Sequence, residues 1–303
     1  MKIAITGGTG FIGKHLARDL AGRGHEVVVI ARGLYTRGKE ISSPKNVTTI
    51  SANITDTDAL TRAFAGCAAV AHCAGTSTED GLQTFQHVHV DGARSVVEAA
   101  RQAGVRKLVL VSFLRVRPDI NSTYHKTKWE GEQIVRESGL DHTIIKAGLV
   151  YGPGDHLLHN LGNLLKKLPV FATVGLRERT VRLIAVEDLV TVIRTALLEE
   201  RLSNQTVAVV GPEEFPFSTA ARRIAKTLGR PFLLVLPFPV FAQRLLAWVS
   251  GMMPTPLVSA SQVQMLADGI SVPLPDSQPL PDDLAPQTRF TEEQIRKGLP
   301  TPE

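Results

Sequence analysis

Short apolar runs rich in β-branched residues alternate with longer amphipathic stretches through the first half of the chain. The apolar runs predict strands at residues 2–6, 26–31, 47–50, 69–74, 107–112 and 142–147. Helical spacing of apolar residues between them predicts helices that begin near Phe11, Thr57, Gln83 and Tyr124. Buried strands separated by helices are typical of a parallel sheet covered on both faces. The pattern therefore predicts an α/β fold with a doubly wound, Rossmann-type sheet.

The composition changes after Tyr151, so we expect a nucleotide-binding core over residues 1–150 and a smaller C-terminal lobe over residues 151–303. The lobe is expected to be interleaved with the core, because residues 186–210 read as a further helix and strand that return to it. The other elements expected in the lobe are a strand-like run at 180–186, a helix from about Ser218 to Leu228, extended chain from Val272, and a short helix capped by Thr291 and Gln294 with Gly298 near its end.

The most apolar segment of the chain is residues 231–254. Pro237 and Pro239 divide it, and the part that follows is too short to span a bilayer and contains Arg244. We expect a buried helix or one that caps the lobe. Peripheral contact with a membrane is the alternative.

Composition and charge exclude several classes of protein. Hydrophobic residues make up 43% of the chain and charged residues 21%, as in ordinary soluble domains. The net charge of +5 is scattered rather than gathered in blocks, so no nucleic-acid partner is expected. Cys67 and Cys73 match neither a zinc site nor a disulfide framework. The first residues already read as a strand with no leader pattern, so a cytoplasmic protein is expected.

The first strand runs directly into a glycine-rich turn, Ile5 to Gly13, that opens a helix. Glycines fit two registers, either Gly8, Gly10 and Gly13 or Gly7, Gly10 and Gly13. In either register they allow a tight turn, close approach of backbone to a pyrophosphate, and close helix packing. Together with Thr9, Phe11 and Ile12, these glycines are candidate contacts to a dinucleotide.

The ends of the next strands suggest which dinucleotide is bound. NAD-selective proteins place an acid after the second strand, whereas this chain has Arg32, which could pair with a 2′-phosphate, with help from Arg37 or Lys39. We therefore favour NADP over NAD. Further cofactor contacts are expected at the ends of the third and fourth strands, from Asn53, Ile54, Ala74 and Gly75.

Three residues form a candidate catalytic set. The fifth strand ends at Ser112, and Tyr124 and Lys128 stand one helical turn apart soon after it. A nearby ammonium should lower the pKa of Tyr124, so that its phenol can exchange a proton with a substrate oxygen. Ser112 would position that oxygen, and Lys128 would also bond the nicotinamide ribose.

These motifs resemble the short-chain dehydrogenase/reductase superfamily, in its extended and atypical branch of epimerase/dehydratase and NmrA-like proteins. Particular similarity is found to relatives of the NAD(P)H-binding accessory subunit of respiratory complex I. The matching runs are TGGTGFIG, VHVDGARSVVEAARQAGVRKLVLVS, the Tyr124 to Lys128 motif, LVYGPGD and VEDLV. The resemblance implies the register Gly7, Gly10, Gly13 and the catalytic trio Ser112, Tyr124 and Lys128.

The chain also departs from these relatives. His89 stands where they often have an asparagine of a proton relay, and Asn53 where they often have aspartate. Lys146 and Ala147 replace a frequent Arg-Pro pair, and Lys146 is taken as a further cofactor contact. His156 and His159 have no third ligand near in sequence, so no metal is expected.

The sequence thus predicts an NAD(P)-dependent oxidoreductase or epimerase/dehydratase that acts on a small carbonyl or hydroxyl substrate. The alternative is a non-catalytic NAD(P)H-binding sensor or assembly module. Contact with a membrane surface or a respiratory complex, and a homodimer, are further partner hypotheses.

Overall fold

The computed structural model describes residues 1–32, 45–119, 122–174, 178–238 and 271–299. The chain forms two compact units. Unit 1 comprises Met1–Ala147, Leu189–Ala208 and Pro275–Leu284, and unit 2 comprises Gly148–Asp188, Val209–Leu274 and Ala285–Glu303. The predicted contributions of Arg37 and Lys39, and the part of the apolar segment after Phe238, lie outside the described residues.

Unit 1 is built on an eight-stranded sheet with the order β14-β11-β6-β5-β4-β1-β2-β3. The central strands β1, β2, β4, β5 and β6 pair in parallel, as predicted. The strand bounds are β1 Lys2–Thr6, β2 Glu26–Ala31, β3 Val47–Ser51, β4 Ala69–His72, β5 Lys107–Phe113, β6 Asp141–Ala147, β11 Gln205–Val209 and β14 Gln278–Pro279. The strand order reverses beside β1, where β2 lies on one side and β4 on the other, and such a reversal opens a crevice at the carboxyl ends of the strands.

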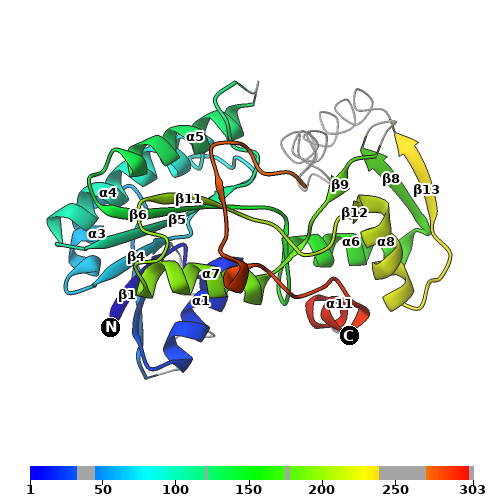
Figure 1. The fold of residues 1–303 in the computed structure, drawn as a ribbon, viewed down its shortest axis with the longest axis horizontal. Coiled ribbons are helices and arrows are strands. Elements are labelled where there is room, and N and C mark those ends of the chain that lie inside the picture. Colours follow the sequence, from blue (N-terminus) through cyan, green and yellow to red (C-terminus); the bar gives the residue numbers. More distant parts are fainter. Residues whose placement is uncertain (33–44, 120–121, 175–177, 239–270, 300–303) are drawn as a thin grey trace. The chain divides into compact units, whose positions relative to one another are not determined.

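Helices cover both faces of this sheet (Figure 1). One layer contains α3 (Thr57–Phe64), the π-helical turn η1 (Gln86–Asp91) with α4 (Gly92–Gln102), and α5 (Thr123–Arg136). The other layer contains α1 (Phe11–Gly22) and α7 (Val186–Leu198). Because both faces are covered, β5 is buried at every residue, which explains its continuous apolar run.

The return of residues 275–284 to unit 1 was not anticipated from the sequence. Within it, β14 pairs with β11, and Asp283 forms an ion pair with Arg201 at 2.7 Å. A two-residue strand carries no hydrophobic periodicity, so its place in the sheet depends on contacts made across the fold.

Unit 2 has its own hydrophobic core between α6 (His156–Lys167), α8 (Phe217–Thr227) and α11 (Glu292–Gly298). Its strands form pairs, namely β7 (Val150–Tyr151) with β10 (Ile184–Ala185), β9 (Thr180–Val181) with β12 (Phe215–Pro216), and β8 (Val170–Val174) with β13 (Leu234–Phe238). The predicted cap of α11 is confirmed, since Thr291 Oγ1 accepts a hydrogen bond from the Gln294 N–H.

Two expectations for unit 2 need correction. The strand-like run 180–186 is two strands of two residues, β9 and β10, separated by Arg182 and Leu183, and Val186 begins α7. Residues 234–238 of the apolar segment form the strand β13 rather than a helix, because β8 offers it a parallel partner.

In the described part of the chain, no helix combines the length and the apolar character that a bilayer crossing requires.

Candidate functional site

The glycine turn after β1 is packed so tightly that two of its glycines cannot be replaced without strain. Gly7 has a φ of +69°, and a Cβ there would lie 2.6 Å from the backbone nitrogen of Ala74. A Cβ on Gly13 would press on the Gly7 carbonyl oxygen. Only Gly7 of the first two glycines has the left-handed conformation, so the geometry agrees with the register Gly7, Gly10, Gly13.

The turn leaves the start of α1 free to bind an anion. Gly10 is the N-cap residue and supplies no side chain, and the first turn of the helix contains no acid. The N–H groups of that turn therefore need acceptors that the cap does not provide, and a pyrophosphate could supply them. Thr9, Phe11 and Ile12 remain partly exposed around them. These features fit the diphosphate of a dinucleotide.

A surface depression follows the ends of β2 and β3. It is lined by Arg32, Asn53, Asp80, Leu82, Gln83 and His87. The Arg32 guanidinium is exposed and donates a hydrogen bond to Gln83 Oε1. Ile54, by contrast, packs with the core of unit 1 and against Gly92 of α4. Arg32 and Asn53 are therefore brought together as predicted, whereas the Ile54 side chain supports the sheet edge.

Sequence reasoning missed the loop that carries Gln83 and Asp80. The two residues exchange backbone hydrogen bonds of 2.9 and 3.3 Å across a turn in which Gly81 has a φ of +52°. An Asp-Gly pair is a turn signal that could have been noticed, but the proximity of this turn to Arg32 could not.

Tyr124 and Lys128 lie on one face of α5, with Lys128 Nζ 5.9 Å from the centre of the tyrosine ring. The ammonium also lies 3.6 Å from the position that a Cβ on Gly75 would take. Lys128 therefore lies beside the loop that follows β4. This arrangement joins the predicted pair to the edge of the sheet where the glycine turn lies.

Burial dominates the electrostatics of this pair. Desolvation lowers the pKa of Lys128 to about 8, although the charge of Glu132 opposes the shift. Burial raises the pKa of Tyr124 above its ordinary value. The prediction that Lys128 lowers the pKa of Tyr124 is therefore not met, because desolvation of the phenolate raises that pKa.

Aromatic rings enclose Tyr124. The rings of Phe85, His89, Phe113 and His125 have their centres 5.2–6.0 Å from that of Tyr124, all edge-to-face. Such contacts fix the orientation of the phenol and exclude water from its ring.

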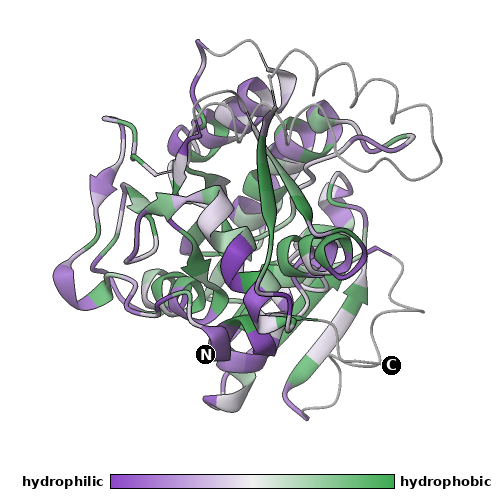
Figure 2. Ribbon diagram, turned by 90° about the vertical axis from the view of Figure 1, so that its right-hand side faces the viewer, coloured by the Kyte–Doolittle hydropathy of each residue, from purple (hydrophilic) through white to green (hydrophobic). Residues whose placement is uncertain are grey.

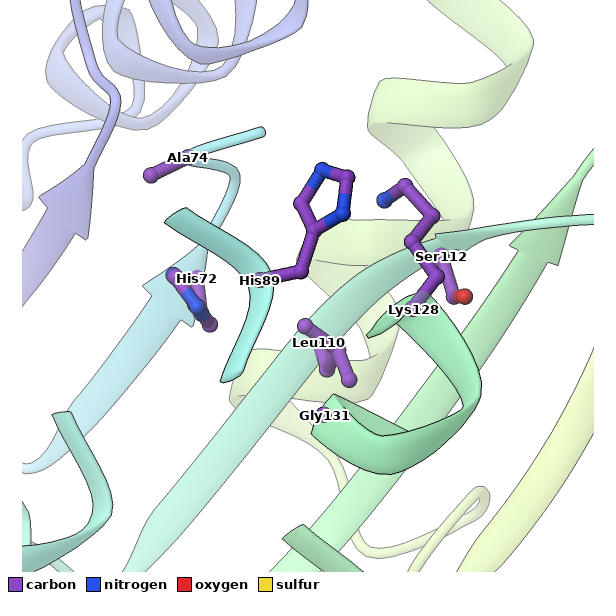
Figure 3. A pocket seen from close by; sticks show the side chains of 7 residues that line it. All are labelled: His72, Ala74, His89, Leu110, Ser112, Lys128 and Gly131. Atoms are coloured by element: carbon purple, nitrogen blue, oxygen red, sulfur yellow. The ribbon is translucent and has the colours of Figure 1, made fainter. Parts of the chain in front are cut away.

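Ser112 is directed to a different partner from the one that the sequence suggested. Its hydroxyl donates a 2.6 Å hydrogen bond to Oε1 of Glu132, a fully buried carboxylate two turns after Tyr124 on α5. Figure 3 shows Ser112, Lys128 and His89 around one small internal pocket, with the Ser112 oxygen turned away from His89. The hydroxyl that was predicted to position a substrate oxygen thus donates its hydrogen bond to a buried side chain of the protein.

Glu132 is the centre of a buried ion network. Arg136 lies 2.9 Å and Lys146 3.4 Å from its Oε2. Lys146 Nζ also donates to the Val116 carbonyl at 3.0 Å and to Asp276. Lys146 is wholly buried, and through these acceptors its Nζ links β6 to the returning segment. Its role as a cofactor contact stays a prediction.

His89 connects the site to the loop after β4. Its Nδ1 lies 3.0 Å from Thr127 Oγ1. Its Nε2 lies 3.1 Å from the backbone carbonyl oxygen of Thr76 and 3.3 Å from the backbone nitrogen of the same residue. Burial and the charge of Lys128 lower its pKa, so the ring is neutral. With both nitrogens engaged, His89 holds α5 to the loop.

Comparison with known proteins places the chain in a family. Residues 7–156 match a family described as NAD(P)H-binding. Ceramide reductase of Caulobacter vibrioides is 33% identical over 244 residues, which cover 78% of this chain and 74% of that protein. The chain belongs to the NAD(P)H-binding short-chain dehydrogenases/reductases of the extended, NmrA-like type.

Two further similarities fit this family. The 2-alkyl-3-oxoalkanoate reductase of Stenotrophomonas maltophilia is 29% identical over 180 residues, 52% of this chain and 53% of that protein. The solved structure of a triphenylmethane reductase from Citrobacter superposes with a TM-score of 0.75 at 18% identity, over 98% of both chains. As a family member, the chain has an NAD(P)H-binding domain, and the relatives named here are reductases.

Proposed function

We propose that this extended short-chain dehydrogenase/reductase is an NADPH-dependent reductase of a ketone carried by a lipid-like molecule. The observation that carries the proposal is the position of Tyr124 and Lys128 on one face of α5, with Lys128 beside Gly75. The dinucleotide supplies a hydride when bound. The protein must then supply a proton, and a site that excludes water.

Tyr124 is the proposed proton donor. Burial raises its pKa, so the phenol is protonated at neutral pH and can donate to a substrate oxygen as negative charge develops there. Lys128, with a pKa of about 8, is mainly cationic at neutral pH and stabilises the phenolate that is left. Both groups are therefore in the protonation state that reduction requires.

The lipid-like character of the substrate rests on the relatives. The names of the two similar reductases refer to a ceramide and to a 2-alkyl-3-oxoalkanoate, both of which carry long or branched alkyl groups. The preference for NADPH rests on Arg32, because an exposed guanidinium held by Gln83 is suited to a phosphate and no acid follows β2 directly.

The test is a titration of the protein with NADPH and NADH, followed by oxidation of bound NADPH on addition of a long-chain β-keto ester. Tyr124→Phe should retain NADPH affinity and lose turnover at least about a hundredfold, as expected for loss of a general acid. Tyr151→Phe, a buried tyrosine of unit 2, is the matched control. Arg32→Ala should weaken NADPH much more than NADH, with the exposed Arg101→Ala as its control.

Tight binding of NADPH without oxidation by any carbonyl of a broad panel would contradict the proposal. That result would favour the alternative, a non-catalytic NAD(P)H-binding module, which the two reductase relatives do not favour.

A further inference from the structure

Large apolar side chains gather on one face of unit 2. Of the eight large hydrophobic residues exposed in the described part of the chain, five come from the end of α6 and from the chain at β13. Their exposed fractions are 42% for Leu164, 54% for Leu168, 72% for Phe232, 44% for Leu234 and 45% for Leu236. We call these five residues the apolar face.

The fold brings the five residues side by side. Leu164 and Leu168 stand one turn apart at the end of α6. The N–H of Leu234 donates to the carbonyl of Pro169, the residue after Leu168, at 2.9 Å, and β13 then runs parallel to β8. Figure 2 looks onto this side of unit 2, where β8 and β13 are coloured as hydrophobic.

The outer side of β13 is apolar although it does not build the core. Leu233 and Val235 pack into the core of unit 2, so the alternating side chains of Leu234 and Leu236 point to the opposite face. A strand with one covered side ordinarily carries polar residues on the other. Apolar residues on both sides of β13 therefore indicate that its outer side meets an apolar environment.

The segments that build the apolar face are basic. The segments that build it, 156–174 and 217–238, contain no aspartate or glutamate. Lys166 and Lys167 close α6, and Lys226 and Arg230 follow on the approach to β13; all four are exposed. None of the four forms an ion pair with any residue that the structure describes.

We propose that the apolar face, with its basic rim, binds the surface of an anionic lipid bilayer. Apolar side chains enter the headgroup region while lysines and arginines contact anionic headgroups, and the combination is stronger than either part alone. A second copy of this chain is the less suitable occupant, because two identical basic rims would repel each other. This inference goes beyond the proposed function and does not depend on it.

The test uses the full chain without cofactor and measures its co-sedimentation with vesicles. Vesicles of phosphatidylcholine with phosphatidylglycerol should bind the protein, vesicles of phosphatidylcholine alone should bind it much less, and added salt should weaken binding. The double variant Lys166→Glu/Lys167→Glu should reduce binding at least about tenfold. Arg101→Glu/Arg106→Glu, which reverses two exposed charges in unit 1, should not.

The apolar contribution is tested with Phe232→Ser/Leu234→Ser, against Leu82→Ser, which changes an exposed leucine of unit 1. The first variant should lose vesicle binding while its far-ultraviolet circular dichroism and melting temperature stay as in the wild type, and the second should bind normally. Equal binding by all variants would overturn the proposal. A second result would also overturn it, namely a wild-type protein that is a dimer and binds no vesicles, together with a monomeric Phe232→Ser/Leu234→Ser variant. The apolar face would then be an interface between two copies of the chain.

Discussion

The Ser112 hydroxyl donates a hydrogen bond of 2.6 Å to Glu132, across the interface between β5 and α5. The bond ties the end of the central strand to the helix that carries Tyr124 and Lys128. Glu132 also pairs with Arg136 and Lys146, so ion pairs as well as packing hold α5 in place. Removing the Glu132 carboxylate should therefore lower the stability of the fold more than it changes catalysis.

Glu132→Ala is expected to lower the free energy of unfolding by about 1–3 kcal/mol, because it removes the buried acceptor that Ser112, Arg136 and Lys146 share, while Lys146 keeps Asp276 and the partly exposed Arg136 keeps Thr206. Glu132→Gln keeps an acceptor for Ser112 and should cost less. Urea unfolding, followed by the fluorescence of Trp129 near Lys146, measures both. Glu130→Ala, exposed on the same helix, is the control, and a Glu132→Ala protein as stable as this control would contradict the prediction.

The glycine turn offers a second prediction, which distinguishes an effect on stability from an effect on cofactor binding. Gly7→Ala should lower stability by more than about 1 kcal/mol, since alanine disfavours the positive φ and its Cβ meets backbone. Gly10→Ala, whose nearest contact would be 3.1 Å, should be nearer to wild type in stability yet bind NADPH more weakly. Thermal unfolding and NADPH titration distinguish the two, and the reverse order of stability would show that the register is wrong.

NADPH affinity should depend on pH through Lys128. Its pKa of about 8 means that above this pH the side chain must take up a proton to become the cation that an anionic cofactor favours. Affinity is therefore expected to fall as pH rises from 7 to 9. Lys128→Met should bind more weakly at pH 7 and show a flatter profile by calorimetry; an unchanged slope would assign the effect to another group.

Two buried histidines should make the fold sensitive to acid. Burial lowers the pKa of His72 to about 3 and also lowers that of His89, so both are neutral in the folded chain. Unfolding lets them take up protons below pH 6.5, and stability is lost as pH falls from there towards the folded pKa. Each histidine should lower the free energy of unfolding by about 2 kcal/mol between pH 7 and pH 5.

The matched test compares His89→Gln with the partly exposed His142→Gln, using urea unfolding at pH 7 and pH 5. His89→Gln should lose stability at pH 7 and show a smaller further loss at pH 5. Equal pH dependence in both variants would indicate that His89 is already charged in the fold.

Local pattern was sufficient for most elements of unit 1 and for the class of fold. The alternation of apolar runs and amphipathic helices reflects how each segment buries its own side chains, so the parallel sheet could be predicted. The glycine turn and the spacing of Tyr124 and Lys128 are local as well, since three or four residues determine a turn or one helical face. Arg32 and Asn53 were placed together because the ends of neighbouring parallel strands meet.

Tertiary structure decided what depends on distant partners. The sequence showed that Ser112 ends a strand, but not that Glu132, twenty residues on, would accept its hydrogen bond. The position of Lys146 depends on Asp276, 130 residues away, which arrives with a segment too short to show a pattern. The pKa of Tyr124 depends on rings that surround it from three elements. Burial and long-range pairing have no local signature, and for that reason the sequence indicated where the site lies, whereas the fold determined how its groups are charged and connected.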